Sequence, residues 1–120
     1  MAKAEQLDGA RVVVANVGDA DTKQLQTLAD RVRDGLGTGV AILGSTREGK
    51  PYIAVAVSKD LTTKVQAGVV VKEVAPLMGG NGGGPATSAS GGGKEPARLG
   101  DALSSAQRMV RERLMGGSGN

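Results

Sequence analysis

The chain has 120 residues, of which 39% are apolar and 22% are charged, and its net charge is +3. It contains 20 glycines and one tyrosine but no cysteine, histidine, tryptophan or phenylalanine. These absences exclude disulfides, Cys/His zinc sites, a Ser-His-Asp triad and histidine-ligated haem. No apolar run approaches the ~18 residues of a membrane span, so we expect no membrane partner and a cytoplasmic protein.

The length predicts one domain with a modest core. Residues 1–7 are charged and helix-favouring, and we interpret them as a tail or the end of a preceding helix. A single globular domain is expected over 8–115, followed by a flexible C-terminus at 116–120. The continuous apolar run at 12–15 is typical of a strand that is covered on both faces.

A capping box introduces the next element, because Gln24 follows Asp21 at the required spacing. Apolar residues then recur at helical intervals as far as Leu36, where closely spaced glycines end the helix. Two apolar runs at 40–43 and 52–57 flank a polar turn, which predicts a hairpin of two buried strands.

A second helix is predicted over 65–78, kinked or ending near Pro76, because proline removes an interior hydrogen bond. The segment 79–93 holds eight glycines in fifteen residues. Pro96 suits the first turn of a last helix. The apolar face of that helix comprises Leu99, Ala102, Leu103, Ala106, Val110 and Leu114. This order predicts an α/β fold: a small mixed sheet with packed helices and a glycine-rich loop between the last two helices.

Two interpretations of the segment 79–93 remain open from composition. It is either a flexible linker or a backbone anion site, in which several N–H groups point into one concavity. It matches no nucleotide-binding loop, because Gly93 and Lys94 are followed by glutamate. We expect it to be ordered and packed beside Ser58 and Lys59. Valine at Gly83 is expected to damage it, through a left-handed backbone angle or a blocked approach.

Other polar features carry weaker signals. The string Ser58-Lys59-Asp60 follows a buried strand and suits either a turn or a ligand group at the strand's carboxyl end. The arginines of the last helix suit either a solvated face or phosphate contacts. The carboxylates are scattered, so the sequence predicts no catalytic residue, no metal and no cofactor.

Four segments together resemble the C-terminal globular domain of bacterial alanyl-tRNA synthetase, which is associated with the DHH phosphoesterases. They are Gly39–Ser45, Val57–Thr62, Ala67–Glu73 and the glycine-rich segment 79–93, and the resemblance extends over about Asp8 to Leu114. It implies a tRNA-binding module that recognises the outer corner of alanine tRNA and aids charging and editing by the rest of the synthetase. It also implies basic residues at Asn81 and Pro85, where this chain has none.

The resulting hypothesis is a non-catalytic module that binds RNA through shape and phosphates, which needs no aromatic stacking. Two alternatives remain: the substrate-holding lobe of a DHH-type phosphoesterase, and a dimerisation or assembly module. The candidate RNA contacts are Ser58, Lys59, Asn81, Gly82, Gly83, Gly84, Ser90, Lys94 and Arg98.

Overall fold

A six-stranded mixed sheet forms the middle layer of the protein, with strands in the order β1-β2-β3-β4-β6-β5. The computed structural model describes residues 3–7 and 10–115. Strands β2 and β3 are parallel, and all other neighbours are antiparallel. The strands are β1 (Lys3–Leu7), β2 (Ala10–Asn16), β3 (Gly39–Arg47), β4 (Lys50–Val57), β5 (Asn81–Gly83) and β6 (Ser88–Gly92).

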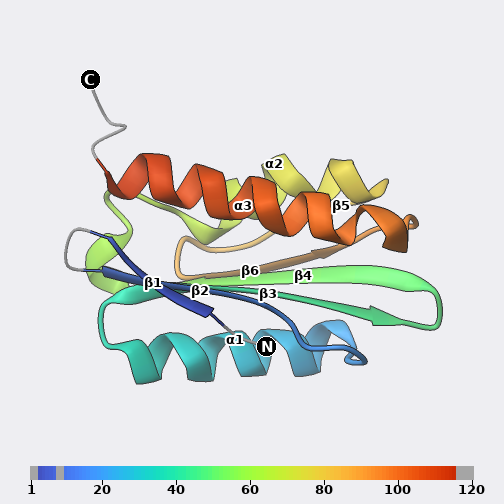
Figure 1. The fold of residues 1–120 in the computed structure, drawn as a ribbon, viewed down its shortest axis with the longest axis horizontal. Coiled ribbons are helices and arrows are strands. Elements are labelled where there is room, and N and C mark those ends of the chain that lie inside the picture. The colour runs from blue at the N-terminus through green and yellow to red at the C-terminus, as the bar shows by residue number, and fades with distance from the viewer. Residues whose placement is uncertain (1–2, 8–9, 116–120) are drawn as a thin grey trace.

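Helices cover both faces of this sheet. Figure 1 shows α1 on one face and α2 and α3 side by side on the other. The α-helices are α1 (Thr22–Leu36), α2 (Ala67–Val74) and α3 (Leu99–Leu114). Short 3-10 turns are η1 (Lys59–Leu61), η2 (Ala75–Met78) and η3 (Pro96–Arg98). The expected α/β fold with a small mixed sheet is confirmed.

Local signals set the helix boundaries. The predicted capping box is present: Gln24 N–H donates to Asp21 Oδ1 over 2.8 Å, and Asp21 N–H donates to Gln24 Oε1 over 3.0 Å. The second helix ends at Val74 and tightens into the 3-10 turn that contains Pro76, in agreement with the expected break. No helix of the described residues has the length and apolar character needed to cross a membrane.

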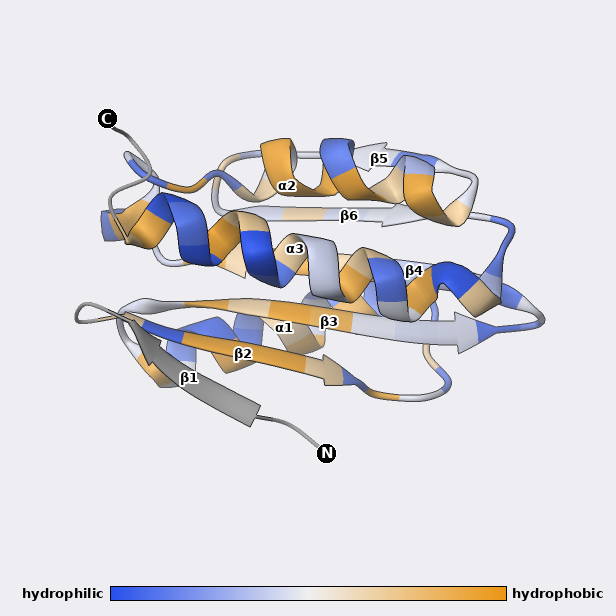
Figure 2. Cartoon of the chain, turned by 45° about the horizontal axis from the view of Figure 1, so that its top comes forward, coloured by the Kyte–Doolittle hydropathy of each residue, from blue (hydrophilic) through white to orange (hydrophobic). Residues whose placement is uncertain are grey.

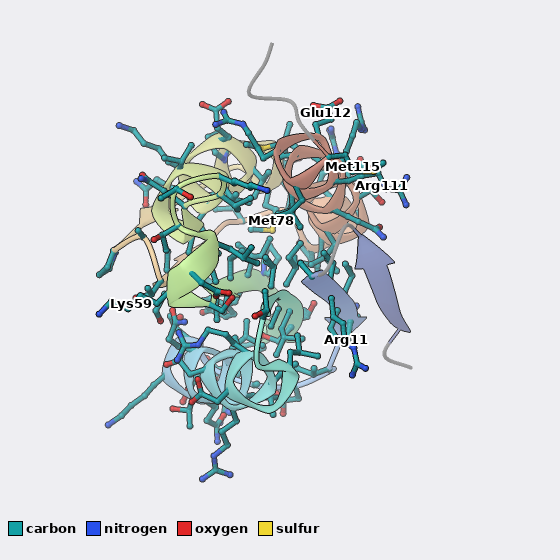
Figure 3. All side chains as sticks on the ribbon, turned by 90° about the vertical axis from the view of Figure 1, so that its left-hand side faces the viewer. Arg11, Lys59, Met78, Arg111, Glu112 and Met115 are labelled. Carbon is teal, nitrogen blue, oxygen red and sulfur yellow. The ribbon has the colours of Figure 1, made fainter. Side chains whose placement is uncertain are left out.

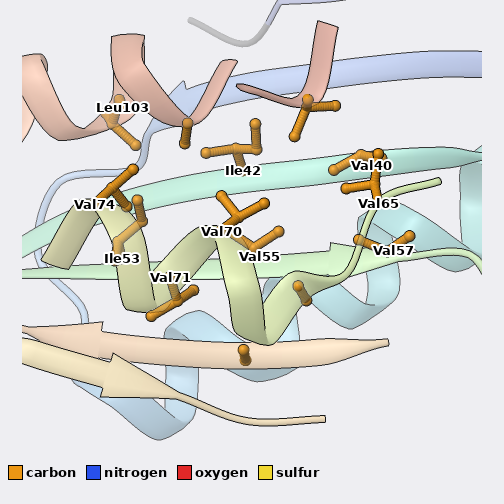
Figure 4. Close-up of a cluster of buried hydrophobic side chains, with 14 of the residues drawn as sticks. Val40, Ile42, Ile53, Val55, Val57, Val65, Val70, Val71, Val74 and Leu103 are labelled. Atoms are coloured by element: carbon orange, nitrogen blue, oxygen red, sulfur yellow. The ribbon is translucent and has the colours of Figure 1, made fainter. Parts of the chain in front are cut away.

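The core lies on the two faces of the sheet. In β4, Ile53, Val55 and Val57 face α2 and α3, whereas Ala54 and Ala56 face α1. Figure 4 shows the larger cluster between the sheet and the paired helices, and Figure 2 shows apolar stripes along α3. All six residues predicted for the apolar face of α3 are buried.

The interpretation of residues 1–7 as a tail or helix end is wrong for the described part. Lys3–Leu7 forms β1 and pairs antiparallel with β2. Its sequence has no alternating apolar pattern, so the strand depends on backbone pairing with the edge of β2, which local sequence does not encode. The C-terminus expected at 116–120 lies outside the described residues.

The segment 79–93 is not a loop between two helices. It contains β5 and β6, which form a hairpin at the edge of the sheet next to β4. We call residues 81–92 the glycine hairpin. Glycine has a low propensity for β-strands, so residue propensity did not predict these two strands.

Candidate nucleic-acid interface

Helix α2 packs unusually close to the glycine hairpin. A Cβ atom on Gly68 of α2 would collide with the carbonyl oxygen of Gly84. A Cβ on Gly82 or Gly91 would stand 2.8 or 3.0 Å from Cγ1 of Val71. The helix therefore approaches the strands closely only because these positions lack side chains. Close packing, rather than linker flexibility, explains much of the glycine content.

The expected backbone anion site is not formed by the glycines at the open end of the hairpin. There, the N–H of Gly79 donates to Pro76 O over 3.0 Å, and that of Gly80 to Ala75 O over 3.2 Å. Across the hairpin, Gly93 N–H donates to Pro51 O over 3.0 Å. Because these three donors are already used within the fold, they are not available to an anion at this end.

Gly83 differs from its neighbours. It has no positive φ, so the expected left-handed backbone angle is wrong at this residue. A Cβ on Gly83 would meet no heavy atom within 4 Å. The fold does not require glycine here, and only a ligand that approaches the strand would distinguish glycine from a larger residue.

The turn of the hairpin packs beside the end of β4, as expected for the glycine-rich segment. The backbone N–H of Val57 donates to Thr87 O over 2.9 Å. On the other side, Arg33 of α1 donates to the same carbonyl over 2.8 Å, and the Ser88 hydroxyl donates to Asp30 over 2.9 Å. Helix α1 thus fixes the position of the turn.

Ser58 is part of the fold at this end. Its buried hydroxyl accepts a hydrogen bond from Gly39 N–H over 3.0 Å. Its hydroxyl and that of Thr38 hydrogen-bond to Asp60 and hold the pKa of that carboxyl below its ordinary value of 3.8. Hydrogen bonds thus link the start of β3, the end of β4 and the turn η1.

Within the part of the chain that the structure describes, three hollows border the glycine hairpin. The lysine hollow, of about 420 Å³, lies at its open end, and the turn hollow, of about 460 Å³, lies beside its turn. A smaller side hollow of about 200 Å³ lies between the hairpin and α2, where Lys72 is the charged lining residue. The lysine hollow is lined by Lys50, Gly79, Gly80, Asn81, Gly92, Gly93 and Lys94. The turn hollow is lined by Arg33, Asp34, Gly37, Val57, Ser58, Lys59, Asp60 and Thr87.

Two arginines of this region are paired with carboxylates. Arg33 is paired with Asp30 and Asp34, and Arg98 donates to Asp101 over 2.8 Å. In contrast, no lysine whose side chain the structure describes has a carboxylate partner. The four lysines that line the hollows are exposed and free to meet an anion.

The candidate RNA contacts do not form one site. Lys59 lines the turn hollow, whereas Asn81 and Lys94 line the lysine hollow, and the five-residue strand β6 separates the two ends by roughly 13 Å. Figure 3 shows Lys59 on the opposite side of the molecule from Arg11 and Arg111. The sequence predicted a glycine-rich loop here, but a hairpin extends the chain and spreads its residues.

The remaining candidates are placed along and beside the hairpin. Gly82 faces α2. Gly84, nearer the turn, has its carbonyl oxygen against Gly68 of the same helix. Ser90 pairs with Gly83 and with Ala54, whose side chain packs towards α1, so Ser90 lies on the α1 face. Arg98 is exposed at the start of α3 and paired with Asp101.

Sequence reasoning missed two residues of this surface. Lys50 is the first residue of β4, and Lys72 belongs to α2. Nothing in their local sequence distinguishes them from other surface lysines. Their position beside the hairpin becomes visible only once the order of the strands is known. Among the described residues, no group of three or more carboxylates could hold a metal ion.

Comparisons with known proteins agree with this architecture. The family described as the DHHA1 domain matches residues 9–112. The chain is 44% identical over 113 residues to the alanine–tRNA ligase of Anaeromyxobacter dehalogenans (strain 2CP-C), a match that covers 94% of this chain and 12% of that protein. It is 38% identical to the alanine–tRNA ligase of Pelotomaculum thermopropionicum over 95% of this chain and 13% of that protein. The chain therefore spans about one eighth of the length of these relatives.

Solved structures are similar to the whole chain. The C-Ala domain of Aquifex aeolicus alanyl-tRNA synthetase has a TM-score of 0.80 and 30% identity, and the match covers 95% of this chain and 99% of that one. The DHH domain of a member of the s1p family of ribosomal proteins has a TM-score of 0.67 at 16% identity, covering 92% of this chain and 28% of that one. At that identity the second likeness concerns the fold alone.

Proposed function

Because the chain belongs to the DHHA1 domain family, we propose that it is the tRNA-binding C-terminal module of an alanine–tRNA ligase. In this proposal it binds the outer corner of alanine tRNA in the cytoplasm. The remainder of the ligase is its second partner, and the module helps that remainder to charge and edit the same tRNA. The module itself contributes no catalytic residue, metal or cofactor.

The observation that carries the proposal is the set of lysines along the glycine hairpin. Lys50, Lys59, Lys72 and Lys94 line its three hollows, and none has a carboxylate partner among the described side chains. Lysine is a mobile point charge that suits phosphate groups. The glycines between them let a polynucleotide backbone come close to the strand.

This mode of binding needs few aromatic residues. RNA elements recognised by shape are held through phosphates and 2′-hydroxyl groups, whereas single strands are usually held by base stacking. A chain with one tyrosine suits the first mode. We propose Lys59, Asn81, Lys94 and the edge of Gly82–Gly84 as contacts. Ser58, Ser90 and Arg98 are proposed to support them through the fold.

Titration of labelled tRNA at several salt concentrations tests the proposal. Three phosphate contacts would lower the affinity about 40-fold between 50 and 200 mM salt, since log K falls by about 0.9 per contact with log salt. An acceptor-stem hairpin that lacks the corner should bind more weakly than whole tRNA. An affinity that does not change with salt concentration would contradict recognition through phosphates. Equal affinity for whole tRNA and the acceptor-stem hairpin would contradict recognition of the corner. A measured molecular mass equal to two copies of the chain, together with no affinity for RNA, would favour the assembly module.

A further inference from the structure

We infer that the lysine hollow is a phosphate-binding site, formed by the side chains of Lys50, Asn81 and Lys94. This inference rests on the proposed function for its biological ligand, which is a phosphodiester of the RNA backbone. Its chemistry is that of any phosphate group, so free phosphate is a second possible source. Lys50 is the first residue of β4, the strand that pairs with β6 of the glycine hairpin.

Charge distinguishes this hollow from the other two. Its ionisable lining residues are two lysines, which gives +2. The turn hollow is lined by Arg33 and Lys59 but also by Asp34 and Asp60, so its charges sum to zero. The side hollow has Lys72 alone, which gives +1. Of the three hollows, the one at the open end of the hairpin therefore has the most positive lining, and such a lining attracts an anion.

One carboxylate lies near this site without lining it. A Cβ on Gly79 would stand 2.8 Å from Oε2 of Glu95, so that carboxylate lies against the glycine turn. It offsets part of the lysine charge, and the local balance stays positive. Asn81 is exposed and contributes an uncharged amide donor to the same hollow.

The walls of the hollow are kept free of side chains by packing. A Cβ on Gly80 would collide with the carbonyl oxygen of Gly92, and one on Gly93 with that of Met78. The backbone N–H groups of Gly79, Gly80, Gly93 and Lys94 already serve internal hydrogen bonds, the last of them to Met78 O over 2.8 Å. We therefore expect the lysine and asparagine side chains to bind the anion, which makes the site removable by side-chain substitution.

The test is a charge-matched pair of double variants. Lys50→Gln with Lys94→Gln removes the site, and Lys23→Gln with Arg31→Gln removes the same charge from the exposed outer face of α1. All four side chains are on the surface, so circular dichroism should show unchanged folding. We expect the first variant to bind tRNA about tenfold more weakly near 100 mM salt. Its salt slope should fall by about 1 in log K against log salt, and the control should keep the wild-type slope.

The outcomes separate the site from the proposed function. Wild-type binding by the Lys50/Lys94 variant would overturn the site and leave tRNA binding in place. Equal losses in both variants would overturn it too, because charge alone would then explain the effect.

A second measurement covers the case in which no tRNA binds. Sodium phosphate is titrated against the ¹⁵N-labelled protein while the Asn81 and Lys94 amides are followed. Saturable shifts that vanish in the Lys50/Lys94 variant would support the phosphate site although the proposed function had failed. Absence of saturable shifts, together with absence of tRNA binding, would overturn both.

Discussion

Gly68 offers the sharpest test of why this chain is rich in glycine. In Gly68→Ala the new methyl group meets the carbonyl oxygen of Gly84, which belongs to the backbone of the glycine hairpin and cannot rotate away. Overpacking of this kind costs about 1–3 kcal/mol. Alanine also lowers the conformational entropy of the unfolded chain, which stabilises the fold by about 0.4–1 kcal/mol. We expect a net loss of about 1–2 kcal/mol in the free energy of unfolding.

Gly100→Ala is the matched control. Gly100, like Gly68, is the second residue of its α-helix, and a Cβ there would meet nothing within 4 Å. The same substitution should therefore stabilise the protein by about 0.4–1 kcal/mol. For 120 residues the entropy of unfolding is about 0.25 kcal/mol/K, so 1 kcal/mol corresponds to about 4 °C in Tm.

Thermal and urea denaturation followed by circular dichroism measure both variants. The expected Tm change is about −4 to −8 °C for Gly68→Ala and about +2 to +4 °C for Gly100→Ala. If both substitutions raise Tm equally, α2 does not lie against Gly84, and the packing explanation of the glycines is refuted.

Three further predictions concern the turn end and the edge of the hairpin. Ser58→Ala leaves the buried N–H of Gly39 without its acceptor and should cost about 1–3 kcal/mol in urea unfolding, and an unchanged midpoint would contradict this role. The folded-state pKa of Asp60 is lowered, so its charge stabilises the fold above the ordinary pKa of 3.8, and this contribution is lost as pH falls through the folded value. Stability of Asp60→Asn should accordingly lie below wild type at pH 6 and converge with it in acid, and a difference that is constant with pH would refute the assignment. Gly83→Val should keep the wild-type melting temperature but bind tRNA more weakly, because its side chain would stand in open space on the strand that RNA approaches; a lowered melting temperature would show that the fold itself needs glycine there.

Elements whose signals are local were predictable from the sequence. The capping box at Asp21 and Gln24 needs only neighbouring residues, and the apolar face of α3 follows from helical spacing. The hairpin of β3 and β4 also follows from two apolar runs around a turn. In each case propensity, pattern and tertiary packing favour the same structure.

Elements that depend on distant partners were not predictable. The polar strand β1 exists through pairing with β2, and the glycine hairpin exists because β4 pairs with it and α2 covers it. The layout of the candidate site also depends on distant partners, so it was not predictable either. Lys59 and Lys94 were both predicted as RNA contacts, but they lie at opposite ends of the hairpin, and Lys50 lines the same hollow as Lys94 only because of the strand order.

Mapping of the tRNA contact surface by NMR tests the central claim most directly. Amide shifts of the ¹⁵N-labelled protein are followed as unlabelled tRNA is added at low salt. We expect the largest changes on the glycine hairpin and around Lys50 and Lys94, and the smallest on the outer face of α1, from Lys23 to Arg31. Changes centred on α1, or spread evenly over all basic residues, would contradict the claim that the hairpin edge is the RNA-binding surface.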